Sequence, residues 1–190
     1  NMKYKNLRVP YGLSVHGNEE IESVTKVLKS STQMGKNVSN FEKKIAKLFS
    51  KKYGLMVNSG SSALLLAMET LDIPEGSEII TPALTFSTTV GYIVRNKLIP
   101  VFVDVEPDTL CLEIDAVRQA ITSKTKAIML VSANGRYPKA GIKAFESLAK
   151  EKELILIEDA AQAVGVKYKG SDPKHYSAEK SKLVYCTDGW

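Results

Sequence analysis

Residues 78–103 read EIITPALTFSTTVGYIVRNKLIPVFV, which is a short apolar run, an amphipathic stretch and a second short apolar run. The runs at 78–80 and 99–103 lack polar alternation, and this pattern predicts strands that are buried on both faces. The stretch at 87–95 between them predicts a helix. A strand, a helix and a strand in this order are typical of a βαβ unit with parallel strands.

The same rhythm continues on both sides of this unit. Further apolar runs predict strands at 55–57, 127–131 and 154–157, and residues 166–168 are a candidate sixth strand. Amphipathic stretches predict helices at 62–71, 114–121 and 142–151. The fold class is therefore α/β, a mostly parallel sheet flanked by helices. Ligands of such sheets bind at the carboxyl ends of the strands.

The first part of the chain is predicted to be helical without strands. Residues 19–28 predict one helix, and a second helix follows Gly35, capped by Ser39 or Asn40. We therefore expect an N-terminal helical segment over residues 1–53 and the α/β domain over residues 54–170. Residues 171–190 form a divergent tail in this division.

The composition excludes several classes of protein. The chain has 190 residues, 44% hydrophobic, and its 26 basic and 21 acidic residues give a net charge of +5. Its lysines lie mainly on polar helix faces, so a solvated surface is favoured over a nucleic-acid interface. These lysines include Lys43, Lys44, Lys47, Lys51 and Lys52. Cys111 and Cys186 lack the spacing of a metal site. No apolar run is long enough to span a membrane, and the N-terminal residues lack the apolar core of a signal peptide, so a cytoplasmic location is expected.

Residues 58–62 form a loop between a predicted strand and a predicted helix. Gly60 allows close approach of a ligand, and Ser61 and Ser62 offer amides and hydroxyls at a helix N-terminus, which favours an anion such as phosphate. A serine N-cap with a glycine turn would explain the same residues without a ligand. The loop matches neither the dinucleotide-binding nor the P-loop pattern.

Two further features are candidates for a site at the strand ends. Asp159 follows a buried strand, where it could cap a helix, join a buried ion pair or face a cationic ring nitrogen. Gln162 lies one predicted helical turn further on. Phe86 precedes a helix and could stack on a flat cofactor, although a core position is the more common outcome for such a residue.

Taken in order, several motifs resemble one known family. They are NSGSSAL at 58–64, EIITP at 78–82, TF at 85–86, PVFVDV at 100–105, KTKAI at 124–128 and IEDAAQA at 157–163. This order is similar to the N-terminal half of the DegT/DnrJ/EryC1/StrS sugar aminotransferases, enzymes of fold-type I that depend on pyridoxal 5'-phosphate (PLP). The resemblance covers residues 12–170 and implies the aspartate aminotransferase-like large domain, in truncated form.

The resemblance implies a role for each candidate residue. Gly60 and Ser61 would hold the cofactor phosphate, with Ser62 nearby. Phe86 would stack on the pyridine ring, and Asp159 would pair with its protonated nitrogen, so that the ring stays an electron sink. Gln162 would donate a hydrogen bond to the phenolic oxygen of the ring.

The resemblance ends after Gly170. Family members carry a Ser-Phe-x-x-x-Lys segment whose lysine binds PLP covalently, and at that offset this sequence has Asp188. Lys180 and Lys182 come too early and lack the Ser-Phe context. The small C-terminal domain of the family is also missing, so we expect an inactive fragment without a recognisable catalytic lysine.

Three functions remain open at this point. The first is transfer of an amino group from an amino acid, with glutamate the expected donor, to a nucleotide-linked keto-sugar in polysaccharide biosynthesis. The second is a sugar 3-dehydrase of the same family, in which a histidine replaces the lysine. Residues 58–62 and 88–90 resemble that branch, whereas Gln162 resembles the aminotransferase branch. His175 comes too early in the sequence to be that histidine. The third is a non-catalytic remnant that binds a phosphate ligand. Full-length relatives are expected to be homodimers, with no nucleic-acid or membrane partner and no metal.

Overall fold

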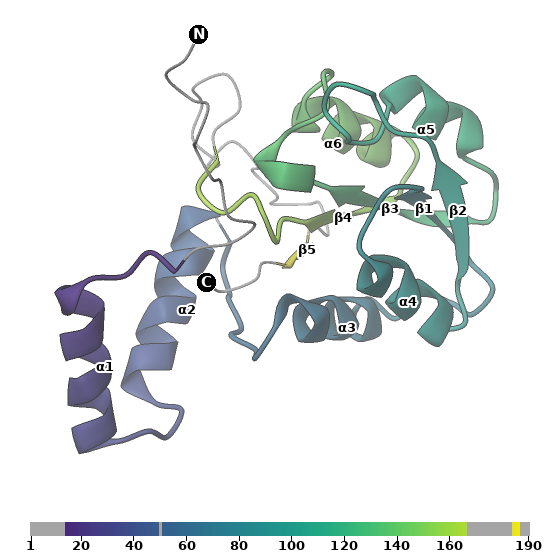
Figure 1. The fold of residues 1–190 in the computed structure, drawn as a ribbon. Coiled ribbons are helices and arrows are strands. Elements are labelled where there is room, and N and C mark those ends of the chain that lie inside the picture. Colours follow the sequence, from purple (N-terminus) through teal and green to yellow (C-terminus); the bar gives the residue numbers. More distant parts are fainter. Residues whose placement is uncertain (1–13, 50, 167–183, 187–190) are drawn as a thin grey trace, which may run out of the picture. The chain divides into compact units, whose positions relative to one another are not determined.

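The computed structural model describes residues 14–49, 51–166 and 184–186 (Figure 1). The chain divides into two compact units, Asn1–Val38 and Ser39–Trp190, and each is described by itself. In the first unit, helix α1 (Asn18–Ser30) confirms the helix predicted over residues 19–28. The Glu20 carboxylate accepts a hydrogen bond of 2.7 Å from the Gly17 N–H, which satisfies one amide at the start of the helix.

Helix α2 (Lys36–Leu48) confirms the second predicted helix but begins earlier than expected. The prediction that Ser39 or Asn40 caps it is wrong, because both residues lie inside the helix. Lys36 at its start is exposed, so water can satisfy the first amides and no side-chain cap is required.

Five parallel strands form the sheet, in the order β2-β1-β3-β4-β5. They are β1 (Glu78–Pro82), β2 (Ile99–Val103), β3 (Thr125–Val131), β4 (Ile155–Asp159) and β5 (Val184–Cys186). The first four confirm predicted strands. The register pairs Val131 at the end of β3 with Asp159 at the end of β4, so the strand ends lie at one edge of the sheet.

The predicted strand at residues 55–57 is wrong. A short apolar run becomes a strand only where a neighbour accepts its backbone hydrogen bonds, and none of the five strands of the described sheet pairs with it. Leu55 is accordingly 74% exposed. The candidate strand at 166–168 lies largely outside the described residues. β5 was not predicted, although residues 183–186 form a short apolar run in the supposed tail.

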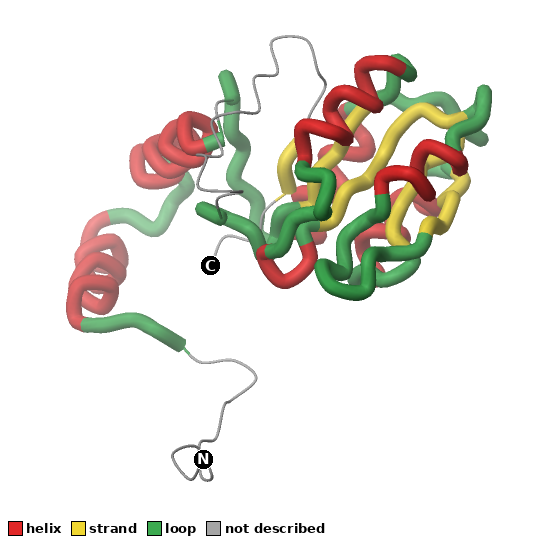
Figure 2. Tube along the Cα trace, turned by 90° about the horizontal axis from the view of Figure 1, so that it is seen from above, coloured by secondary structure: helices red, strands yellow, loops and turns green. Residues whose placement is uncertain are grey.

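Two layers of helices cover the sheet (Figures 1 and 2). Helices α3 (Gly60–Thr70) and α4 (Ser87–Arg95) pack on one face, and α5 (Ile114–Ala120) and α6 (Ile142–Glu151) pack on the other. Neighbouring strand residues serve opposite faces: Ile79 packs in the cluster with α3 and α4, whereas Ile80 packs in the cluster with α5 and α6. Sheet residues are therefore buried on both sides, as the uninterrupted apolar runs predicted.

The connections place two helix N-termini beside the strand ends. α4 follows β1 directly, and α3 precedes it, so that both helices run back along the sheet and begin at its carboxyl edge. The short 3₁₀-helix η1 (Ala133–Gly135) follows β3 at the same edge. None of the helices in the described part of the chain has the length and apolar character of a membrane span.

Candidate functional site

Helix α3 begins at the loop that the sequence singled out. Ser59 is its N-cap, and the Ser59 hydroxyl accepts a hydrogen bond of 3.2 Å from the Ser62 N–H. Gly60 is buried in the first turn, and Ser61 beside it is half-buried. The helix dipole places partial positive charge here, so the capped helix keeps the properties of an anion site.

The serines of this loop have different environments. The Ser62 hydroxyl donates to Asn58 Oδ1 at 2.6 Å and accepts from the Ser59 hydroxyl at 3.1 Å. Ser62 is therefore engaged within the loop through both its amide and its hydroxyl. The Ser61 hydroxyl instead points across to α4, where it contacts Thr88 Oγ1 at 3.5 Å. Of the two serines, Ser61 is therefore the one whose hydroxyl faces α4 rather than its own loop.

Asp159, at the end of β4, is 7% exposed and is surrounded by hydrogen-bond donors. Its Oδ2 accepts from the Thr89 hydroxyl at 2.9 Å, and its Oδ1 accepts from the Ala161 N–H at 3.3 Å. Hydrogen bonds of this kind stabilise the ionised carboxylate over the protonated acid. The structure thus holds a buried carboxylate at the carboxyl edge of the sheet.

The helix-cap interpretation of Asp159 is wrong. Residues 160–166 form successive turns, with hydrogen bonds from Ala163 N–H to Ala160 O and from Val166 N–H to Ala163 O. The chain turns here because Gly165 adopts a φ of +77°, which a continuing helix does not allow. Asp159 instead stabilises its own turn through the Ala161 amide.

Helix α4 brings the anion loop and the carboxylate close together. Consecutive residues of its first turn contact them: Thr88 contacts Ser61, and Thr89 contacts Asp159. The structure therefore places Asp159 near the loop at residues 59–62, as the sequence predicted from the strand ends. Thr89 was missed by the sequence analysis, although its position one turn after Phe86 in the same helix is a signal that could have found it.

Phe86 is the N-cap residue of α4, and its side chain is 71% exposed. The core interpretation of this residue is therefore wrong: the apolar cluster of α3 and α4 is filled by residues such as Ile93 and Met68. An exposed aromatic ring at the N-terminus of α4, three residues before the Thr89 that contacts Asp159, is suited to covering a flat ligand.

Gln162 is exposed and has a defined amide orientation. Its Oε1 accepts a hydrogen bond of 2.8 Å from the Asn134 N–H. A backbone N–H can only donate, so the atom facing it is the amide oxygen, and the amide NH₂ must point the other way. Asn134 adopts a left-handed conformation, with φ +53°, which aims its N–H at Gln162.

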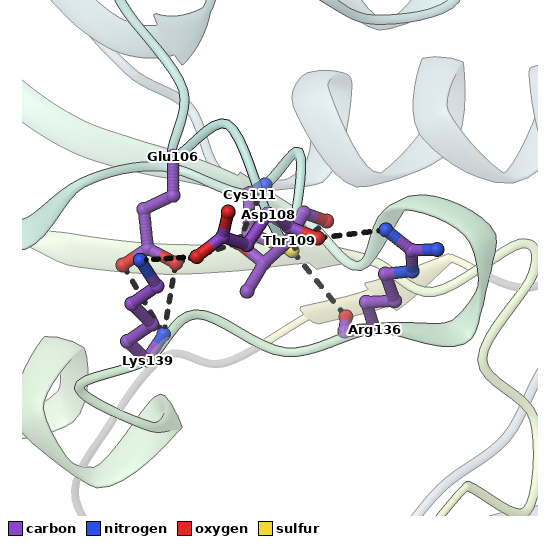
Figure 3. A network of polar contacts seen from close by, with 6 residues as sticks. All are labelled: Glu106, Asp108, Thr109, Cys111, Arg136 and Lys139. Atoms are coloured by element: carbon purple, nitrogen blue, oxygen red, sulfur yellow. Dashed lines mark hydrogen bonds and ion pairs between the residues drawn. The ribbon is translucent and has the colours of Figure 1, made fainter.

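A network of polar contacts fastens the loop after β3 to the loop after β2 (Figure 3). Both oxygens of the buried Glu106 carboxylate accept from the Lys139 N–H, at 3.1 and 3.0 Å, and Thr109 also donates to it. The Lys139 ammonium pairs with Asp108 at 2.7 Å and holds the pKa of that carboxyl below its usual range. Arg136 donates to the Asp108 carbonyl at 2.7 Å. These contacts fix the part of the loop that follows Asn134.

Glu158 points away from Asp159, to the face covered by α6. Its Oε1 accepts from the Ser132 hydroxyl at 2.6 Å, and its Oε2 has no hydrogen-bond partner among the described residues. Burial raises the pKa of Glu158 to about 7, with neighbouring Asp159 and Glu146 adding to the effect. Lys51, which follows the end of α2, acts in the opposite direction and lowers the pKa of Glu158. Burial lowers the pKa of Lys51 itself, and the negative charges of Glu146 and Glu158 partly offset this effect. The prediction that Lys51 lies on a solvated helix face is therefore wrong.

The fold and site together define a parallel α/β domain of the PLP-dependent aminotransferase type. The chain belongs to the DegT/DnrJ/EryC1/StrS aminotransferase family, whose profile matches residues 15–182.

Relatives of known name support this assignment. The spore coat polysaccharide biosynthesis protein SpsC of Bacillus subtilis is 37% identical over 166 residues, 87% of this chain and 42% of that protein. The dTDP-4-dehydro-2,6-dideoxy-D-glucose 3-dehydratase of Saccharopolyspora spinosa is 39% identical over 169 residues, 85% of this chain and 36% of that protein. The chain thus spans less than half the length of these relatives.

Two solved structures share the fold. GDP-4-keto-6-deoxy-D-mannose-3-dehydratase from E. coli, with bound hydrated PLP, has a TM-score of 0.80 and 31% identity, over 86% of this chain and 43% of that one. An aminotransferase from Psychrobacter cryohalolentis has a TM-score of 0.77 and 30% identity, over 86% of this chain and 42% of that one.

Proposed function

We propose that this chain carries the cofactor-binding part of a PLP-dependent enzyme that transfers an amino group from an amino acid, with glutamate the expected donor, to a nucleotide-linked keto-sugar. The observation that carries the proposal is the buried Asp159 carboxylate, held by two donors beside the N-terminus of α3. The family assignment and the nucleotide-sugar substrates in the names of two relatives support it.

The residues of the site fit PLP in charge and in shape. Gly60 and Ser61 offer a close backbone approach and a hydroxyl to a phosphate, at the positive end of α3. The ionised Asp159 is the partner that a protonated pyridine nitrogen needs. Ser62 shapes the loop through Asn58 and is the weakest of the proposed phosphate ligands.

When bound, PLP supplies a ring that accepts the negative charge formed at the carbon next to the amino group. Asp159 would keep the proton on the ring nitrogen and so preserve that capacity. The exposed ring of Phe86 would cover one face of the cofactor and exclude water from it. The Gln162 NH₂, whose direction is set by the hydrogen bond from the Asn134 N–H to Gln162 Oε1, would donate to the phenolic oxygen.

Amino transfer is preferred over 3-dehydration because Gln162 resembles the aminotransferase branch of the family. Sugar 3-dehydration is the second candidate, since a 3-dehydratase is among the relatives at 39% identity. The residue that decides between them, a lysine or a histidine, belongs to the region of Asp188, which lies outside the described residues, as do Lys180, Lys182 and His175. For the whole protein we propose a homodimer that acts in the cytoplasm.

PLP binding to the purified chain tests the proposal. Titration followed by the absorbance of the cofactor should give saturable binding, and Asp159→Asn should weaken it at least tenfold, because a neutral amide does not neutralise the ring nitrogen. Asp104→Asn is the matched control: Asp104 also follows a parallel strand but is exposed, so its replacement should leave PLP binding unchanged. Equal affinity of wild type and Asp159→Asn would overturn the proposal.

A second measurement separates the two reactions. After borohydride reduction, peptide mapping by mass spectrometry identifies any lysine that binds PLP covalently. Incubation with PLP, glutamate and a nucleotide-linked keto-sugar then distinguishes the products, an amino-sugar from a sugar that has lost its 3-hydroxyl. The dehydrated sugar as product would show that the second candidate is correct.

A further inference from the structure

Three side chains form a continuous series of hydrogen bonds from the loop before α4, through the first turn of α4, to the end of β4. The Thr85 hydroxyl donates to the Thr89 hydroxyl at 3.1 Å, and the Thr89 hydroxyl donates to Asp159 Oδ2 at 2.9 Å. Thr89 is fully buried, and Asp159 is nearly so. An ionised carboxylate can only accept, so the single hydroxyl proton of Thr89 is directed to Asp159, and the Thr89 oxygen is left to accept from Thr85.

This direction of donation matters for the charge of Asp159. A hydroxyl that donates to a carboxylate favours the ionised form, and the effect is large where water is excluded. The Ala161 N–H donates to the other oxygen, so the carboxylate is held at both ends. Its plane is thereby fixed by one group from α4 and one from its own turn.

We propose that Thr89 is a positioning residue, which keeps the Asp159 carboxylate ionised and in one orientation for pairing with a protonated ring nitrogen. This inference rests on the proposed function, because it concerns the nitrogen end of the same cofactor. Thr89 does not touch the cofactor in this role but acts through Asp159. Its neighbour Thr88 contacts the anion loop through Ser61, so one turn of α4 sets the separation of the two ends of the site.

The experiment compares two ligands that differ only at the ring nitrogen. The probes are PLP and its 1-deaza analogue, in which a C–H group replaces that nitrogen. Each is titrated into wild type, Thr89→Val, which removes the hydroxyl at nearly constant volume, and Thr89→Ser, which keeps it. Thr85→Val is the matched control, because it removes a partly buried hydroxyl from the same set of hydrogen bonds and leaves the contact of Thr89 with Asp159 intact. Thermal melts of every variant check folding.

The wild type should bind PLP at least tenfold more tightly than the deaza analogue. Thr89→Val should lose most of this preference, by about tenfold, as expected for a hydrogen bond to a charged group. Thr89→Ser should restore the preference to within about threefold of wild type, and Thr85→Val should keep it. Affinity for the deaza analogue should be the same in all four proteins, since it does not use Asp159.

Three outcomes would overturn the inference, and they differ in what they say about the proposed function. If wild type prefers PLP and Thr89→Val prefers it equally, Thr89 has no positioning role, while the proposed function stands. If wild type binds both probes equally, Asp159 does not pair with the ring nitrogen, and the proposed function fails together with the inference. A general loss of affinity for both probes in Thr89→Val, with no change in their ratio, would show a structural role only and would also overturn the inference.

Discussion

Glu158→Gln should remove a pH dependence of stability that a buried carboxyl group imposes on this fold. Burial raises the pKa of Glu158 from 4.5 to about 7, so the folded protein binds this proton more tightly than the unfolded chain does. The stability that this protonated group confers is complete below about pH 4.5 and is lost as the pH rises through 7. This rise in the pKa of Glu158 corresponds to roughly 3 kcal/mol of unfolding free energy, most of which is lost between pH 5 and pH 8.

Urea unfolding at pH 5, 6, 7 and 8 measures this effect. The glutamine oxygen can still accept from Ser132, and the cost of its unpaired NH₂ does not vary with pH, so the difference between variant and wild type isolates the titration. We expect Glu158→Gln to gain roughly 2 to 3 kcal/mol of unfolding free energy relative to wild type between pH 5 and pH 8. Glu69→Gln, at an exposed position of α3, should show no such trend. Parallel stability curves for wild type and Glu158→Gln would refute the reasoning.

Two further predictions concern the loops of the site. Gly135→Ala and Gly165→Ala each impose a left-handed alanine at a cost of about 1 kcal/mol. At Gly135 the new Cβ would lie 3.0 Å from the Gln162 carbonyl oxygen, whereas at Gly165 it would meet nothing within 4 Å. Gly135→Ala should therefore lower the melting temperature more than Gly165→Ala does, and it should also weaken PLP binding. Equal effects of the two substitutions would contradict this prediction. Ser61→Ala should weaken binding of PLP about tenfold more than Ser62→Ala, measured by titration; the opposite order would show that Ser62 is the phosphate ligand.

Local patterns in the sequence were sufficient for most of the architecture. The helix at α4 and the strand at β2 occupy the residues that hydrophobic periodicity predicted, and α6 does so as well. A parallel sheet follows from these patterns, because strands that alternate with helices connect by right-handed crossovers. The same reasoning failed at residues 55–57, since an apolar run specifies burial but not which neighbouring strand will accept its hydrogen bonds.

The candidate residues of the site were also identified from local signals. Ser59 and Gly60 mark a helix start, and Asp159 marks the end of a buried strand, so neither needs long-range information. Their proximity followed from a general rule, that the carboxyl ends of parallel strands and the helices beginning there share one edge of a sheet. The rule predicts the edge of the sheet at which these residues lie, but not which side chains contact one another there.

Only the tertiary structure decided which side chains meet at that edge. Thr89 and Asp159 are 70 positions apart in the chain, and Asn134 and Gln162 are 28 apart, so no local pattern links them. Their contacts depend on the register of β3 against β4 and on the packing of α4 over the sheet. The sequence by itself therefore determined the fold class, the family and the carboxylate. The folded chain determined which group holds the carboxylate, because hydrogen bonds form only between atoms that packing brings within about 3 Å.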